Sequence, residues 1–166
     1  MRIFLIGFMG AGKSTLAPLL ANELGLGHAD LDAEIETEAG IPISHFLTQN
    51  PQRVERFRQL EHEILQRWCQ RDNFVLATGG GAPIFHNGIE AMLRSGTVVW
   101  VQVPLSVAVH RIRHDVKIRP LALDISQLGH LYTERVPVYS KAGIMIDGTL
   151  PPEESARQLA ERLTQV

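Results

Sequence analysis

The sequence contains a single cysteine, Cys69, among its 166 residues. A secreted domain of this size more often carries cysteine pairs that form disulfide bonds, so the low cysteine content indicates a reducing compartment and predicts a cytoplasmic protein. No nucleophile signature surrounds Cys69. We interpret it as a packing residue of a helix rather than a catalytic thiol.

Long hydrophobic runs are also missing. No segment approaches the ~20 apolar residues that a membrane-spanning helix needs, and the apolar residues at 1–6 are too few for the core of a signal peptide. The formal net charge is −2 and the isoelectric point is near 6.4, whereas nucleic-acid-binding domains carry a basic surface. We therefore expect a soluble protein with no membrane partner and no nucleic-acid partner.

Internal repeats, low-complexity tracts and linkers are absent as well, so the chain 1–166 is predicted to be a single domain. Short apolar runs alternate with amphipathic segments, a pattern that predicts an α/β fold with a parallel sheet. We expect strands at 3–6, 26–31, 74–77, 97–103 and 143–146. We expect helices at 14–24, 33–39, 51–71, 88–94, 106–114, 127–136 and 152–163, with a polar connection at 115–126.

One motif carries clear chemistry. Residues 7–14 read Gly-Phe-Met-Gly-Ala-Gly-Lys-Ser and match the phosphate-binding pattern G-x-x-x-x-G-K-[ST]. A predicted strand precedes the motif and a predicted helix follows it, so backbone N–H groups and the helix N-terminus can surround phosphate oxygens. Lys13 can reach the β- and γ-phosphates, and the Ser14 hydroxyl can bind Mg²⁺. The residues predicted to bind the phosphates are Gly10, Ala11, Gly12, Lys13, Ser14 and Thr15.

Three further groups of residues are candidates for the same site. Asp30 and Asp32 follow a predicted strand, at the sheet edge where α/β proteins bind ligands; Asp32 can bind hydroxyl groups, cap the next helix, or do both. Arg58 lies three residues before Glu61, a spacing that fits a structural salt bridge or a guanidinium held for a ligand. Three glycines at 79–81 favour close approach of a ligand to the backbone over a plain flexible loop.

Together with the phosphate loop, these groups stand in the order seen in the shikimate kinase family. The resemblance rests on Asp-Leu-Asp at 30–32, Phe-Arg-Gln-Leu-Glu at 57–61, Gly-Gly-Gly at 79–81, Arg-Pro-Leu at 119–121 and Arg-Val-Pro-Val-Tyr at 135–139. It spans nearly the whole chain. It implies the fold of nucleoside-monophosphate kinases, with three layers, a five-stranded parallel sheet in the order 2-3-1-4-5, and a short lid at about 115–126.

The resemblance also implies the nucleotide side of the site. ATP is the co-substrate, with Arg111 stacked on the adenine and Arg119, in the lid, at the γ-phosphate. Mg²⁺ is the implied cofactor, bound by Ser14 directly and by Asp30 through water. The residues implied to be catalytic are Lys13, Asp32 and Arg119.

On the acceptor side, the resemblance implies transfer of the γ-phosphoryl group to the 3-hydroxyl of shikimate by a monomer. Asp32 is either the base or the group that orients the attacking oxygen. Planar guanidinium groups suit a carboxylate better than lysine does, which agrees with the two implied arginines. The residues implied to bind shikimate are Asp32, Arg58, Gly79, Gly80, Gly81 and Arg135.

Two alternative functions stay open at this point. A gluconate kinase would share the architecture and an acceptor that combines a carboxylate with hydroxyls, although the triple glycine at 79–81 argues against it. A regulatory module that binds nucleotide without turnover is the other alternative. It is favoured by the stretch between Arg119 and Arg135, which is shorter than usual in the family and lacks a glycine-rich, charged lid, and it is disfavoured by the joint presence of Lys13, Asp32 and Arg119.

Overall fold

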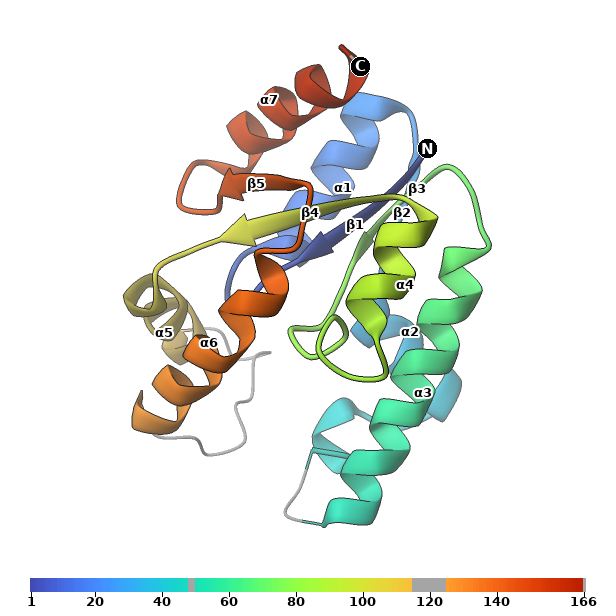
Figure 1. Ribbon diagram of the computed structural model, residues 1–166, viewed down its shortest axis with the longest axis vertical. Helices are drawn as coiled ribbons and strands as arrows, with labels where there is room; N and C mark the ends of the chain where they lie inside the picture. Colours follow the sequence, from blue (N-terminus) through green and yellow to red (C-terminus); the bar gives the residue numbers. More distant parts are fainter. Residues whose placement is uncertain (48–49, 115–124, 166) are drawn as a thin grey trace.

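A computed structural model describes residues 1–47, 50–114 and 125–165, and Figure 1 shows their arrangement. Five parallel strands form one sheet in the order β2-β3-β1-β4-β5, which confirms the predicted fold class and strand order. The strands are β1 Arg2–Ile6, β2 Gly27–Asp30, β3 Phe74–Ala77, β4 Thr97–Gln102 and β5 Ile144–Asp147. The helices are α1 Lys13–Leu24, α2 Leu31–Ala39, the 3₁₀ turn η1 Ile43–His45, α3 Pro51–Cys69, α4 Gly88–Ser95, α5 Leu105–His114, α6 Ile125–Tyr139 and α7 Pro152–Thr164.

Helices cover both faces of the sheet. In Figure 1, α1 and α7 pack together on one face, while α3 and α4 lie on the other. The central strands β1 and β3 are buried over Ile3–Ile6 and Phe74–Ala77, as expected for parallel strands covered on both sides. Helices α5 and α6 lie beyond the ends toward which the strand arrows point (Figure 1). Ligands bind at that edge in open α/β sheets.

The observed helix boundaries lie close to the predicted ranges, with a few corrections. Gly25 and Gly40 end α1 and α2 in the left-handed conformation, which glycine adopts without steric cost. Helix α6 begins at Ile125, two residues before the predicted start, and continues through Pro137 to Tyr139. Among the described helices, none is long and apolar enough to cross a membrane.

The predicted lid at 115–126 lies mostly outside the described residues. Of the segment 115–126, residues 115–124 lie outside the described residues, and Ile125 and Ser126 belong to α6. Arg119, predicted to be catalytic, is therefore also outside the described residues.

Candidate active site

The phosphate loop connects β1 to α1, as predicted. Gly12, with φ +93°, caps α1 without a side-chain hydrogen bond, so no side chain competes for the first N–H groups of the helix, which have no partner within it. The Lys13 ammonium group donates to the carbonyls of Gly7 and Phe8 at 2.9 Å each. Burial lowers the pKa of Lys13 to about 8, although the nearby carboxylates of Asp32 and Asp30 act to raise it. The loop thus places the buried ammonium group of Lys13 at the same end of α1 as the helix's unpaired N–H groups.

Asp30 and Asp32 take different roles at the end of β2. Asp30 Oδ1 accepts from the N–H of Asp32 at 3.0 Å and from that of Ala33 at 3.4 Å, so Asp30, not Asp32, caps α2. The interpretation of Asp32 as the helix cap is therefore wrong, because the helix begins two residues earlier than predicted. Asp30 Oδ2 accepts from the Ser14 hydroxyl. Asp30, the last residue of β2, thus contacts the phosphate loop, and Asp32 lies in the first turn of α2.

The Asp32 carboxylate faces the interior of the site. Burial raises the pKa of Asp32 to about 7, and the nearby Asp30 and Glu61 carboxylates raise it further. Lys13 and Arg58 act in the opposite direction with smaller effect. A carboxylate in this environment is poorly hydrated and accepts hydrogen bonds strongly.

The loop at 79–81 brings the other groups together, one at each glycine. A Cβ on Gly79 would lie 2.7 Å from Oδ1 of Asp32, and a Cβ on Gly80 would lie 3.1 Å from Nη1 of Arg135 and 3.4 Å from a backbone nitrogen of the phosphate loop. A Cβ on Gly81 would overlap the guanidinium of Arg58. Any side chain here would displace a charged group of the site. The glycines therefore allow the close approach of these three side chains, and the predicted approach of a ligand to the same backbone stays a prediction.

Arg58 is held by Glu61, as the spacing predicts. Arg58 Nη1 donates to Glu61 Oε2 at 2.6 Å, and Glu61 is only 2% exposed. Burial raises the pKa of Glu61, outweighing the opposite effect of Arg58. The Arg58 guanidinium also lies 4.8 Å from the ring of Phe57 and 4.1 Å from that of Phe85.

Arg135 reaches the site from α6, on the other side of the glycine loop. In Figure 1 the loop between β3 and α4 lies between α3 and α6. Arg135 is buried, and Tyr139, one turn further along α6, donates its hydroxyl to the Gly80 carbonyl at 2.6 Å. Burial raises the pKa of Tyr139 to about 12, so this donor stays protonated. No role for Tyr139 is predicted from the sequence, although its i+4 spacing from Arg135 places both side chains on one face of the helix.

Arg111 lies against the phosphate loop. Its Nη1 donates to the carbonyls of Gly10 at 3.2 Å and Ala11 at 3.4 Å, and its Nη2 donates to the Gly148 carbonyl at 2.9 Å. Arg111 therefore joins the phosphate loop to the loop between β5 and α7. The resemblance implies that Arg111 stacks on the adenine, which stays a prediction, and the three hydrogen bonds are contacts that only the fold reveals.

Residues 9–164 match the sequence profile of the shikimate kinase (SKI) family. The chain is 36% identical over 160 residues to the shikimate kinase of Aquifex aeolicus, covering 96% of this chain and 94% of that protein. The chain belongs to the shikimate kinase family. Among solved structures, the shikimate kinase of Acinetobacter baumannii in complex with shikimate superimposes with a TM-score of 0.86 at 32% identity, covering 99% of this chain and 90% of that one.

Membership of the shikimate kinase family confirms the predicted activity, ATP-dependent phosphorylation of shikimate. A gluconokinase from Sinorhizobium meliloti shares the fold at a TM-score of 0.58 with 19% identity, covering 99% of this chain and 95% of that one. That likeness concerns the fold alone.

Proposed function

We propose that this site transfers the γ-phosphoryl group of ATP to the 3-hydroxyl of shikimate, with Asp32, Arg58 and Arg135 positioning the acceptor. The observation that carries the proposal is the convergence of these three side chains on the glycines at 79–81, next to the phosphate loop. They come from three separate segments of the chain. The two guanidinium groups suit a carboxylate on the acceptor, and the Asp32 carboxylate suits its hydroxyl groups. The site therefore fits an acid that also carries hydroxyl groups.

On the nucleotide side, the proposal assigns charge neutralisation to Lys13 and to the N–H groups at the start of α1. Arg111 belongs to the proposed nucleotide side because it contacts the carbonyls of the phosphate loop. Arg119 lies outside the described residues, and its proposed place at the γ-phosphate rests on the resemblance. A loose phosphoryl transition state asks mainly for positioning and charge neutralisation.

On the acceptor side, Arg58 and Arg135 bind the carboxylate, and Asp32 accepts a hydrogen bond from the 3-hydroxyl. A bond forms between that oxygen and the γ-phosphorus while the bond to the β–γ bridging oxygen breaks and ADP leaves. The hydroxyl proton leaves along the hydrogen bond to Asp32. This assignment is supported by the proximity of Asp32 to Lys13, Glu61 and Arg58, which all affect its pKa.

Mg²⁺ fits the oxygen ligands that meet at Ser14 and Asp30. The Ser14 hydroxyl contacts Asp30 Oδ2, and Mg²⁺ prefers one or two carboxylate or hydroxyl oxygens combined with waters and substrate phosphates. Within the described residues no three His, Cys, Asp or Glu side chains gather as metal ligands, so the ion would depend on the nucleotide for its remaining ligands. When bound, it would neutralise charge on the β- and γ-phosphates.

We also propose that residues 1–166 form a single domain and that the protein is a cytoplasmic monomer, with ATP and shikimate as its binding partners. Gluconate phosphorylation is the competing activity, and a panel of polyhydroxy acids in an ADP-release assay separates the two. ADP release with shikimate but not with gluconate supports the proposal. Release of ADP with neither acid would favour a nucleotide-binding module without turnover.

The proposed site is tested by Arg58→Ala. Removing one partner of a buried charged contact typically costs 2–5 kcal/mol, so we expect the KM for shikimate to rise at least about 30-fold. The KM for ATP should stay close to that of the wild type. Arg56→Ala is the matched control, because Arg56 is exposed on the same helix. Equal weakening of both substrates by Arg58→Ala would contradict the assignment.

A further inference from the structure

We propose that Phe85 is a positioning residue for shikimate, acting through Arg58. Its ring holds the Arg58 guanidinium at the orientation in which it can bind a carboxylate. The inference rests on the proposed function, in which Arg58 is a carboxylate ligand.

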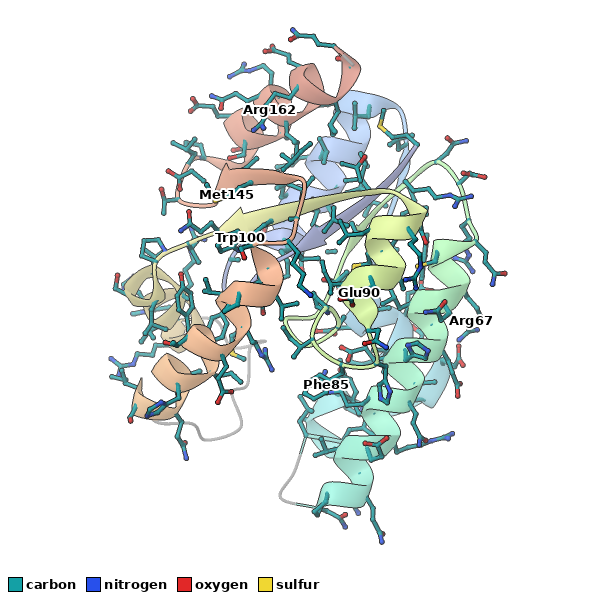
Figure 2. All side chains as sticks on the ribbon, in the orientation of Figure 1. Arg67, Phe85, Glu90, Trp100, Met145 and Arg162 are labelled. Carbon is teal, nitrogen blue, oxygen red and sulfur yellow. The ribbon has the colours of Figure 1, made fainter. Side chains whose placement is uncertain are left out.

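Two aromatic rings contact the Arg58 guanidinium. The Cζ atom lies 4.1 Å from the ring centroid of Phe85 and 4.8 Å from that of Phe57, both inside the ~6 Å range of cation–π attraction. Phe57 precedes Arg58 on α3 and belongs to the buried core. Phe85 is 40% exposed and lies on the loop between β3 and α4, next to α3 in Figure 2. An exposed phenylalanine contributes little to core packing, so its contact with Arg58 calls for another explanation.

The loop that carries Phe85 is built from Gly81 onward. The Gly81 carbonyl accepts from the N–H of Ile84 at 2.9 Å and from that of Phe85 at 3.2 Å. One helical turn therefore links Gly81, which lies against the Arg58 guanidinium, to Phe85. His86 and Asn87 follow with φ of +51° and +56°, a left-handed conformation that is costly for residues other than glycine. The helical turn before Phe85 and the two left-handed residues after it define the backbone path of the loop on both sides of the ring.

The guanidinium needs such a support because its polar contacts alone do not fix its plane. Nη1 donates to Glu61, while Nε is buried and has no hydrogen-bond partner among the described residues. A single hydrogen bond leaves the group free to rotate about it. Bidentate binding of a carboxylate requires a fixed planar fork, and ring contacts restrict the rotation before the substrate arrives.

The contribution of Phe85 should appear in KM rather than in kcat. The carboxylate is remote from the reacting hydroxyl, and contacts of equal strength in the ground and transition states change KM alone. We expect Phe85→Leu, which keeps apolar bulk but removes the ring, to raise the KM for shikimate by about 3- to 10-fold. The kcat and the KM for ATP should stay at the wild-type values.

Matched variants isolate the ring. Phe85→Tyr keeps the aromatic face and should keep the wild-type KM. Leu93→Ala removes an apolar side chain of the same 40% exposure from α4 and should leave the KM for shikimate unchanged. In an Arg58→Ala background, Phe85→Leu should add nothing, because the ring acts through that guanidinium. Thermal melts of each variant ensure that all KM values are measured on folded protein.

The outcomes separate this inference from the proposed function. If Arg58→Ala raises the KM and Phe85→Leu does not, the inference is overturned and the proposed function stands. If the effect of Phe85→Leu persists in the Arg58→Ala background, the ring contacts the substrate directly, which also overturns the inference. If Arg58→Ala leaves the KM unchanged, the proposed function itself fails and this inference fails with it.

Discussion

Buried charges dominate the site at the scale of single residues. Lys13, Glu61 and Arg135 are each less than a tenth exposed, and the isolated burial of any one of them would be strongly unfavourable. Each of them has a neighbour of opposite charge: Asp32 lies near Lys13, and both Arg58 and Arg135 lie near Glu61. Such groups are oriented before a substrate binds. Their burial lowers the free energy of unfolding, and packing elsewhere in the fold offsets this loss.

Glu61→Gln tests this cost. The folded-state pKa of Glu61 lies above its ordinary value of 4.5, so its favourable contribution to stability is complete below pH 4.5 and is lost as pH rises through the folded pKa. Gln does not titrate and avoids this loss. We therefore expect the melting temperature of the variant, relative to that of the wild type, to increase with pH. The increase should be roughly 2–4 °C for each kcal/mol of stability that the wild type loses through Glu61. Thermal melts between about pH 4.5 and pH 8 measure it.

The same variant should also lose function. Gln cannot form the charge-assisted hydrogen bond that holds Arg58, so we expect the KM for shikimate to rise roughly 3- to 10-fold. Glu63→Gln is the control, because Glu63 is exposed on the same helix. A melting-temperature difference that does not change with pH would show that the Glu61 carboxyl titrates at its ordinary pKa.

At the scale of elements, α3 positions Arg58 and Glu61 from a well-defined start. The Asn50 side chain accepts from the N–H groups of Gln52 at 3.0 Å and Arg53 at 3.4 Å, and Pro51 occupies the first turn. An Asn-Pro pair before a helical pattern marks a helix start, so the sequence itself favours this boundary. The helix then presents Phe57, Leu60, Glu61, Ile64 and Leu65 to the interior.

Asn50→Ala should destabilise the protein through this cap. Loss of a helix N-cap costs about 1 kcal/mol, so we expect a melting temperature lower by roughly 2–4 °C in a chain of this length. Asn50→Asp keeps an accepting oxygen and adds a favourable charge at the helix start, and it should retain the wild-type stability. Equal melting temperatures for the Ala and Asp variants would show that the cap contributes nothing.

At the scale of the whole molecule, the site exists only because distant segments meet. Asp32 follows β2, Arg58 comes from α3, Arg135 from α6, and the glycine loop from the end of β3. A substrate that contacts all of them stabilises the folded chain as a unit, because it binds the folded state and not the unfolded state. Binding can therefore be measured as thermal stability.

Arg135→Lys should reduce the stabilisation of the folded protein by shikimate. At shikimate concentrations about 100 times the wild-type Kd, binding adds about 2.7 kcal/mol, or roughly 5–10 °C in melting temperature. Lysine keeps the charge but lacks the planar fork, so we expect the variant to show about half of this shift or less, corresponding to at least tenfold weaker binding. Arg162→Lys on α7 (Figure 2) is the control and should show the full shift. A full shift in Arg135→Lys would remove Arg135 from the proposed site.

The sequence by itself determined the features that depend on neighbouring residues. The phosphate loop, the cap at Asn50, the glycine ends of α1 and α2 and the Arg58–Glu61 pair all follow from residue types at fixed short spacings. The family resemblance added the strand order, because a chain that shares a family's motifs in order shares its fold. The predicted phosphate loop, the Arg58–Glu61 contact and the strand order are confirmed.

Only the tertiary structure decided which groups meet across the sheet edge. Tyr139 on the Gly80 carbonyl, Phe85 on Arg58 and Arg111 on the phosphate loop join residues 27 to 101 positions apart, and no local spacing encodes such contacts. The burial of Glu61 was likewise decided by the fold. The physical reason is that pKa values, close approach and ring contacts depend on distances in space, which the strand order sets and the sequence pattern alone does not.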